Sequence, residues 1–326
     1  MSFDTLTDDI DYQSLKFEEI QRLEERLNEY KVPKNVAIIG PPRVGKSSLM
    51  NSIIASFSSK CWRERTREGF VDQPGEQVTH HLIKITKNEY LGSERQKSYP
   101  YPTLIDMDGF DDESSDEVKE QLRYVLFGVV PNEENIKDTI RVHTSEGVRG
   151  LREICEQEQE HQRMDCLIFV ASSVDLLPCN LMEAIKQITL EEERDVPVFG
   201  VLTKKDKCNP DETDSKKKEF CSKLGISETR SLLCTNYCGD YDNYKGQSRV
   251  NRLYPELDVP ILTFMTQVCD PWIKVIRDKA LPVRSKSKFS AKTDSVSTGS
   301  RWKVVGCGLI IMGVVIFTMY KYVKIR

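Results

Sequence analysis

The sequence predicts an α/β fold in three layers, with helices packed on both faces of a mostly parallel sheet. Apolar runs of strand length alternate with helical patterns along most of the chain, which is typical of parallel strands joined by helices. A glycine-containing turn joins the first apolar run to the helix that follows it. Polar motifs stand directly after later runs, and such folds bind ligands at the carboxyl ends of their strands.

Local patterns predict each element. Apolar residues at helical spacing predict the first helix, with Ser14 as its N-cap and Pro33 beyond its end. Asn180 with Glu183 predicts a capped helix, and Pro271 predicts a kink in the last one. We expect helices over residues 14–30, 46–58, 112–130, 151–163, 180–188 and 261–278. We expect strands over residues 35–40, 78–86, 101–106, 165–173, 196–203 and 231–237.

The composition is that of a globular protein. Of 326 residues, 39% are apolar and 30% are charged, which is too apolar for a disordered chain. The net charge of −4 creates no overall positive field, so we expect no nucleic-acid partner. The ten cysteines have no zinc-site spacing, and the acidic first residues contain no apolar targeting segment. These features indicate reduced thiols in a cytosolic body.

Composition divides the chain into five parts. A disordered N-terminal segment and a helix precede the α/β domain. A basic, serine-rich linker then leads to a run without charged residues and a short basic tail. The boundaries are residues 1–33, 34–280, 281–303, 304–320 and 321–326. Within the domain, the polar and aperiodic residues 60–77 predict a mobile loop.

The first site motif lies between the first strand and its helix. Residues 40–47, GPPRVGKS, fit the phosphate-loop pattern G-x-x-x-x-G-K-[ST] in the required strand–loop–helix context. Backbone N–H groups of such a loop surround phosphate oxygens at a helix N-terminus, its lysine reaches the β- and γ-phosphates, and its hydroxyl binds Mg²⁺. The predicted phosphate-binding residues are Gly40, Arg43, Val44, Gly45, Lys46, Ser47 and Ser48.

The second motif, LIDMDG, ends the third predicted strand. Asp106 would hold Mg²⁺ through water, and the Gly109 N–H would contact the γ-phosphate. An ordinary acidic turn is the alternative. A switch threonine should complete the metal site, with Thr79 as the first candidate and Thr66 as the second. The predicted catalytic residues are therefore Lys46, Thr79 and Gly109, and the predicted metal ligands are Ser47, Asp106 and Thr79.

The third motif, VLTKKD, indicates the base. A carboxylate can accept hydrogen bonds from the N1–H and exocyclic amine of guanine, and adenine offers neither in that geometry. Asp206 has this predicted role, while Lys204 lies along the base plane and Thr203 braces the loop. In the segment CTNY, Thr235 and Asn236 are candidates for the backbone N–H that meets guanine O6. The predicted ligands are GTP or GDP with Mg²⁺, in a P-loop GTPase-like fold.

Five segments together resemble the interferon-induced protein 44 family. They are GPPRVGKSS, LIDMDGF, DCLIFVASS, VLTKKD and LCTNY, in this order within residues 30–280. The resemblance implies a P-loop GTPase-like fold, GTP binding and a part in the interferon-induced antiviral response. This chain departs from the family in two ways. Typical members carry an N-terminal TLDc domain, whereas only about 30 residues precede the first predicted strand here. Typical members also lack a C-terminal apolar anchor, which we expect this chain to have.

Hydrolysis of the nucleotide is open at this point. Many GTPases place a glutamine after D-x-x-G to orient water, whereas this chain has Phe110 and then Asp111. Pro42 stands where small GTPases usually have glycine, close to the γ-phosphate. We expect slow hydrolysis at most, accelerated by self-association. Candidates for a charge-stabilising arginine, each with a solvated surface charge as the alternative, are Arg43, Arg63, Arg65 and Arg67.

Residues 304–320, VVGCGLIIMGVVIFTMY, carry no charge. At about 1.5 Å per residue they span about 26 Å, close to a hydrocarbon core of about 30 Å. Trp302, Tyr320 and Tyr322 suit membrane interfaces, and a buried core helix is the alternative. We expect a tail anchor inserted after synthesis, with the nucleotide-binding domain facing the cytosol. The basic flanks favour the mitochondrial outer membrane, and the endoplasmic reticulum is the second expectation.

Three functions from different classes remain. The first is a membrane-tethered GTP switch of the innate-immune type. The second is a scaffold that holds nucleotide without useful turnover, which Pro42 and the missing glutamine favour. The third is an ATP-using enzyme, against which TKKD argues. The expected partners are guanine nucleotide, the membrane through residues 304–320, and a second copy of the chain.

Overall fold

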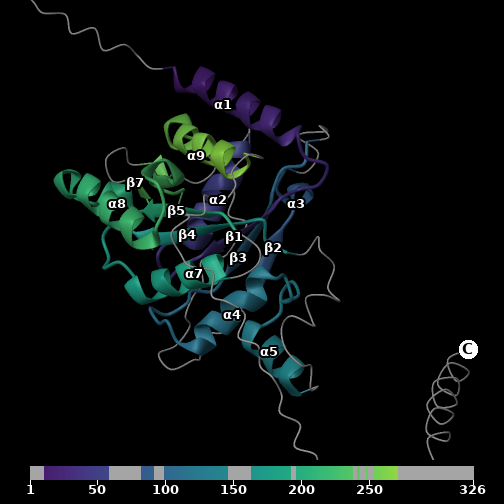
Figure 1. Cartoon of the computed structure of the whole chain (residues 1–326). Helices are drawn as coiled ribbons and strands as arrows, with labels where there is room; N and C mark the ends of the chain where they lie inside the picture. The colour runs from purple at the N-terminus through teal and green to yellow at the C-terminus, as the bar shows by residue number, and fades with distance from the viewer. Residues whose placement is uncertain are drawn as a thin grey trace, which may run out of the picture. The chain divides into compact units, whose positions relative to one another are not determined.

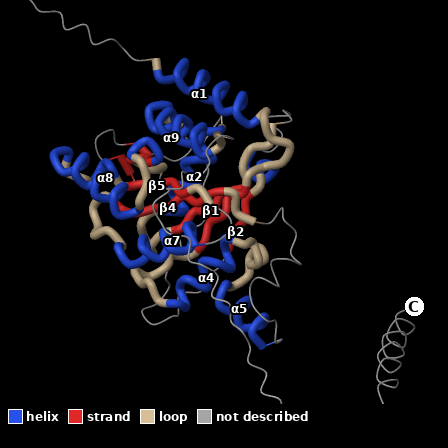
Figure 2. The backbone as a smooth tube through the Cα atoms, in the orientation of Figure 1, coloured by secondary structure: helices blue, strands red, loops and turns tan. Residues whose placement is uncertain are grey.

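The central sheet of the computed structural model has six strands. They are β1 (Asn35–Ile39), β2 (Leu82–Ile85), β3 (Thr103–Met107), β4 (Cys166–Ser172), β5 (Val198–Thr203) and β6 (Ser231–Leu233). Their order in the sheet is β2–β3–β1–β4–β5–β6. Figures 1 and 2 show β2, β1, β4 and β5 in turn across the sheet. β2 is antiparallel to β3, and every other neighbouring pair of this sheet is parallel. The predicted mostly parallel sheet is therefore confirmed.

Helices cover both faces of the sheet. Side chains alternate along a strand, so Val36 and Ile38 of β1 pack against one helical layer, while Ala37 and Ile39 pack against the other. Helices on the Val36 face are α1 (Tyr12–Leu27), α2 (Lys46–Phe57), α3 (Lys87–Leu91) and α9 (Pro255–Val268). Helices on the opposite face are α4 (Asp116–Leu126), α5 (Ile136–Ser145), α7 (Cys179–Glu191) and α8 (Pro210–Leu224). Figure 1 shows α1, α2 and α9 on one side of the sheet and α4 and α7 on the other.

The structure describes residues 11–58, 82–91, 99–145, 163–191, 196–237, 241–242, 247–248 and 253–270. No helix within these residues is long and apolar enough to cross a membrane. The predicted loop 60–77, helix 151–163 and apolar run 304–320 lie outside them, as do Thr66 and Thr79. Those predictions are therefore untested by the fold.

Three predicted boundaries need correction. Ser14 does not cap α1, because the helix begins at Tyr12 and the Asp11 carboxylate accepts the N–H groups of Gln13 and Ser14. The last described helix begins at Pro255, six residues earlier than predicted at 261, and it contains Pro260. Residues 234–237 are a loop and not part of the predicted strand, because β6 ends at Leu233.

α3, α5 and α8 have no counterpart among the predicted helices. α8 nevertheless has clear end signals: Asn209 accepts the Asp211 N–H, Pro210 begins the helix, and Gly225 follows it with a φ of 73°. Its interior is rich in lysine, and only Phe220, Cys221 and Leu224 are buried, so its apolar pattern is too sparse to find by periodicity.

Candidate nucleotide-binding site

The predicted phosphate loop connects β1 to α2. Gly45 has a φ of +93°, and α2 begins at the next residue, Lys46. Arg43 has a φ of 61°, in the left-handed region that non-glycine residues seldom adopt. Left-handed residues of this kind occur in backbone nests that bind anions. The backbone of the loop is therefore suited to a phosphate group, as the motif predicts.

Gly40, the first residue of the loop, lies against β4. A Cβ atom at this position would stand 2.1 Å from the carbonyl oxygen of Val170. Neither group can move freely, because β1 and β4 are paired in the sheet. Because Gly40 has no side chain, the backbone of the phosphate loop can pass close to the backbone of β4 where it leaves β1.

Lys46 is folded back over the loop. Its side chain is buried, and Nζ donates a hydrogen bond to the Pro41 carbonyl oxygen over 2.8 Å. Burial lowers the pKa of Lys46, and the carboxylates of Asp106 and Asp108 oppose that shift. An ammonium group has three donors, so one bond to the loop leaves donors for phosphate oxygens.

The two predicted metal ligands that lie within the described residues are in contact. The Ser47 hydroxyl donates to Asp106 Oδ2 over 2.7 Å, and the Met107 N–H donates to Asp106 Oδ1 over 3.0 Å. Burial raises the pKa of Asp106, while the Ser47 hydrogen bond and Lys46 act in the opposite direction. The carboxylate is therefore held at the end of β3, beside the first turn of α2, at a cost in desolvation.

We predict that Asp106→Asn stabilises the nucleotide-free protein at pH 8. The folded-state pKa of Asp106 is raised. Its contribution to folding is therefore fully present below the unfolded pKa, and it is lost as the pH rises through the folded pKa. The Asn amide carries no charge, and its oxygen can still accept the Met107 N–H, while its NH₂ group can donate to the Ser47 hydroxyl oxygen, which reverses that hydrogen bond. Thermal melts in EDTA should show the variant above wild type at pH 8, with the difference shrinking towards pH 4.

The same substitution should remove the gain in nucleotide affinity that Mg²⁺ provides, since a neutral amide is a poor ligand for a hard cation. The exposed neighbour substitution Asp111→Asn is the control and should change neither property. A variant that melts below wild type at pH 8 would contradict the assigned cost of burying this carboxylate.

The D-x-x-G segment is attached to the phosphate loop. The Phe110 N–H donates to the Gly40 carbonyl oxygen over 3.1 Å. A Cβ atom on Gly109 would stand 2.1 Å from the backbone nitrogen of Pro42. The predicted γ-phosphate sensor therefore lies directly against the loop that would hold that phosphate.

The residues after Gly109 are also attached to α7. Asp112 Oδ1 accepts the N–H groups of Asn180 and Leu181 over 2.8 and 3.0 Å. Asp112 thus caps a helix that we predicted to be capped by Asn180, which instead lies inside α7. Since the two segments are 68 residues apart in sequence, no local pattern could have indicated this cap.

The predicted base-binding motif is hydrogen-bonded to the phosphate loop. The Thr203 hydroxyl donates to the carbonyl oxygen of Val44, so Thr203 braces the loop as predicted. Asn236 Nδ2 donates to the Gly45 carbonyl oxygen over 3.2 Å. The Lys205 N–H donates to the Cys234 carbonyl oxygen over 3.1 Å, which joins the two predicted base-binding segments.

Lys204 and Asp206 lie on the outer side of this arrangement. Lys204 has a φ of 59° and pairs with Asp175 over 3.2 Å. A hydrogen bond from Ser172 lowers the pKa of Asp175, and the pairing with Lys204 lowers it further. Asp206 lies in the short helix η3 (Lys205–Lys207) and is exposed, so its carboxylate is open to a base. Thr235 is half-buried.

Sequence reasoning missed four side chains around the site. Their roles are to cap, pair or anchor the motifs, and the partner of each lies in another segment of the chain. They are Asp112, Ser173, Asp175 and Tyr237. Ser173 ends the quoted segment DCLIFVASS and Tyr237 ends CTNY, but neither motif assigns these two residues a role.

No protein-family model matches this chain, and no curated protein sequence matches it. Among solved structures, it is similar to a dimerization-deficient variant of Toc33 from Arabidopsis thaliana, with 16% identity, a TM-score of 0.41, and 81% of this chain and 96% of that chain covered. For Toc33 with GDP and Mg²⁺ the values are 15%, 0.39, 79% and 91%. For the Sar1 GTPase of Encephalitozoon cuniculi with GDP they are 12%, 0.34, 79% and 89%. The resemblance to the interferon-induced protein 44 family stays a prediction.

Proposed function

We propose that this chain binds guanine nucleotides, GTP and GDP, together with Mg²⁺. The observation that carries the proposal is the direct hydrogen bonding of the base motif to the phosphate motif, from Thr203 to Val44 and from Asn236 to Gly45. The hydrogen bond from the Phe110 N–H to Gly40 adds the D-x-x-G segment to this group. That the three motifs lie together at the carboxyl ends of parallel strands, where such folds bind ligands, supports the proposal of a single nucleotide site.

Each part of the nucleotide has a proposed partner. Lys46 binds the β- and γ-phosphates. Ser47 would bind Mg²⁺ directly and Asp106 would bind it through water, and the ion would supply positive charge beside the phosphates. Asp206 accepts from guanine, Lys204 covers the base, and a backbone N–H of Thr235 or Asn236 meets O6. Thr79 is the proposed switch ligand.

Competition binding tests this function. The full chain, kept in solution with a mild detergent, is titrated with fluorescent GDP in Mg²⁺, and GTP, GDP and ATP are added as competitors. Two hydrogen bonds to a carboxylate predict that ATP competes at least about 100-fold less well than GTP. Equal competition by ATP would favour an ATP-using enzyme, and absence of binding would contradict nucleotide binding altogether.

We propose slow hydrolysis. Phe110, the residue after D-x-x-G, is 1% exposed and packs in the apolar core beside α4 and α7. It therefore cannot orient an attacking water. Pro42 has no N–H to offer the γ-phosphate. A binding scaffold without useful turnover is the second candidate, and the same two residues favour it.

Pro42→Gly should raise the single-turnover rate of GTP hydrolysis by about tenfold, because it restores a backbone donor where charge develops in the transition state. Phosphate release from the preformed GTP complex measures this rate. Pro33→Gly, outside the site, is the control. An unchanged rate would remove Pro42 as the cause of slow turnover and favour the scaffold.

Self-association is proposed to occur next to the base motif. Leu176 is 97% exposed and Val174 is 43% exposed, and they flank Asp175, the partner of Lys204. An exposed apolar pair at this position suits contact with a second copy of the chain. Light scattering of wild type and Leu176→Ser, each with GDP and with GTP, measures this association. Equal molar masses in all four samples would argue against it.

Tethering to a membrane is proposed from residues 304–320, with the mitochondrial outer membrane first and the endoplasmic reticulum second. Resistance of the full chain to carbonate extraction from cell membranes, lost when residues 304–320 are deleted, measures it. A part in innate immunity is proposed from the family resemblance alone. Induction of the transcript by interferon is the corresponding measurement.

A further inference from the structure

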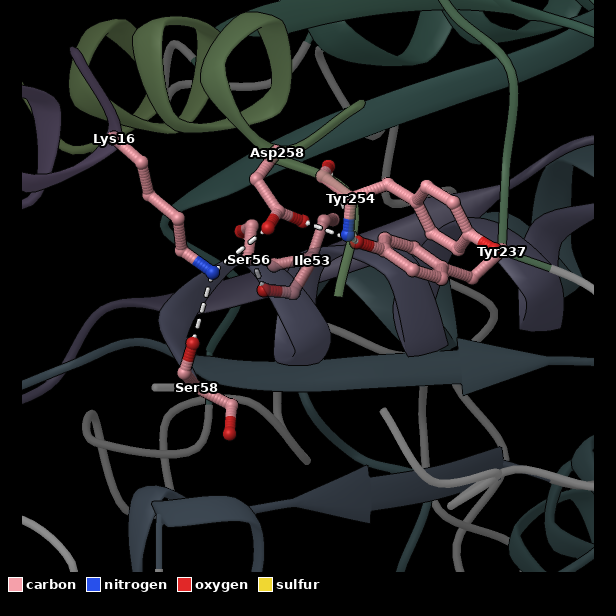
Figure 3. Close-up of polar contacts among 7 residues, drawn as sticks. All are labelled: Lys16, Ile53, Ser56, Ser58, Tyr237, Tyr254 and Asp258. Carbon is pink, nitrogen blue, oxygen red and sulfur yellow. Dashed lines mark hydrogen bonds and ion pairs between the residues drawn. The ribbon is translucent and has the colours of Figure 1, made fainter. Parts of the chain in front are cut away.

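A buried ion pair joins the first and last described helices. Lys16 Nζ of α1 lies 2.7 Å from Asp258 Oδ2 of α9, and the two side chains are 7% and 0% exposed. The Tyr237 hydroxyl donates to the other carboxylate oxygen of Asp258 over 3.0 Å. Figure 3 shows the three side chains converging on one point between α1, α9 and α2.

This cluster is costly to bury. Burial raises the pKa of Asp258, and Lys16 and Tyr237 oppose that shift. A buried ion pair often contributes less stability than apolar residues of the same volume, and such pairs are in some proteins retained because they fix one arrangement. The arrangement that this ion pair would fix involves Tyr237, which is hydrogen-bonded to Asp258.

Tyr237 belongs to the loop that is predicted to meet guanine O6. Its N–H donates to the Ser52 hydroxyl of α2 over 2.7 Å, and its hydroxyl accepts the Tyr254 N–H. The preceding residue, Asn236, donates to the Gly45 carbonyl oxygen. The loop is thus fastened to α2 and the phosphate loop on one side and to α9 on the other.

Lys16 also reaches α2. Its ammonium group donates to the carbonyl oxygen of Ser58 over 2.9 Å, at the residue that follows the last turn of α2 (Figure 3). The first turn of α2 carries Lys46 and Ser47, which are the predicted phosphate and metal partners. One ammonium group therefore contacts the end of the phosphate-binding helix and the carboxylate that holds the base loop.

We infer that Tyr237, Asp258 and Lys16 are positioning residues for guanine recognition. They touch no nucleotide. They hold the loop 234–237 against α2 so that its backbone N–H lies within hydrogen-bonding distance of O6. The inference rests on the proposed function, and it makes α1, which precedes the first strand, a structural part of the base site.

The test separates positioning from general stability by comparing GTP with two analogues. 6-Thio-GTP replaces O6 with a weaker acceptor, and ITP lacks the exocyclic amine that Asp206 would bind. In Tyr237→Phe and in Lys16→Met, we expect GTP affinity to fall by about tenfold, the loss of about one hydrogen bond. The preference for GTP over 6-thio-GTP should disappear, while the preference for GTP over ITP should remain.

Tyr90→Phe is the matched control. Like Tyr237, Tyr90 is a buried tyrosine with a hydrogen-bonded hydroxyl. It lies in α3, and its hydroxyl donates to the backbone carbonyl oxygen of Pro102 over 2.7 Å. Removal of the Tyr90 hydroxyl should lower the melting temperature, as Tyr237→Phe does. It should leave the preferences for GTP over 6-thio-GTP and for GTP over ITP unchanged. Tyr237→Phe removes one oxygen atom, so it keeps the test valid if Lys16→Met does not fold.

The outcomes distinguish the two proposals. If wild type prefers GTP over ITP and Tyr237→Phe behaves like Tyr90→Phe, the positioning role is overturned and guanine binding stands. If wild type has no preference for guanine, both proposals fall.

Discussion

Asp206→Asn is expected to change the base preference of this protein from guanine to xanthine. The Asp206 carboxylate is proposed to accept hydrogen bonds from the N1–H and the exocyclic amine of guanine. Asn has one acceptor and two donors, so it can donate to the O2 atom that replaces the amine in xanthine. Each hydrogen bond to a charged group contributes about 1.5–3 kcal/mol. GTP affinity should therefore fall by about 100-fold or more.

The structure around Asp206 indicates that this substitution alters the contact with the base without disturbing the fold. Asp206 is exposed, and the loop that carries it is held through other residues. The Thr203 hydroxyl bonds Val44, and the Ser173 hydroxyl donates to the Lys204 carbonyl oxygen over 2.9 Å. The substitution should therefore leave the melting temperature of the nucleotide-free protein unchanged.

Competition of fluorescent GTP by GTP and XTP measures the change. Asp214→Asn, an exposed aspartate in α8, is the control and should keep the wild-type preference. If Asp206→Asn leaves GTP and XTP affinities as they are in wild type, Asp206 does not bind the base. The nucleotide assignment would then rest on the phosphate loop alone, which many ATP-binding proteins share.

The strands of the six-stranded sheet could be predicted because most of them are short apolar runs between polar turns, whereas the two-residue strands Tyr241–Asp242 and Gln247–Ser248 were not predicted. β4 shows this most clearly, since all seven of its residues are buried. The helices were harder to predict. α8 buries only a few residues of its length, and α7 is capped by Asp112, a residue from another segment. An amphipathic pattern can be recognised within a short stretch of sequence. A helix cap supplied by a residue that is distant in sequence cannot be recognised in this way.

The same distinction applies to the site. Lys46, Ser47 and Asp206 belong to short motifs whose chemistry follows from residue type and spacing. The contacts that hold those motifs together span the whole chain, as the pair Lys16–Asp258 does over 242 positions. A single sequence contains no sign of such a pair, because each partner alone resembles an ordinary surface charge.

Gly109→Ala is expected to separate recognition of GTP from that of GDP. A Cβ atom at this position would lie 2.1 and 2.4 Å from the N and Cα atoms of Pro42, and 2.6 Å from the carbonyl carbon of Pro41. All three are backbone atoms, so the two segments must move apart. The Phe110 N–H would then lose its bond to Gly40. Overpacking of this kind costs about 1–3 kcal/mol, which a thermal melt would register.

The effect on binding follows from which phosphate each segment contacts. The β-phosphate is proposed to bind the phosphate loop, so GDP affinity should stay within about threefold of wild type. The γ-phosphate is proposed to accept the Gly109 N–H, and loss of one bond to a charged group predicts a fall of about 10–100-fold in GTP affinity. Asp111→Ala, an exposed neighbour, should change neither. Equal losses for GTP and GDP would mean that the displacement spreads into the phosphate loop, and Gly109 would then be a packing residue with no part in sensing the γ-phosphate.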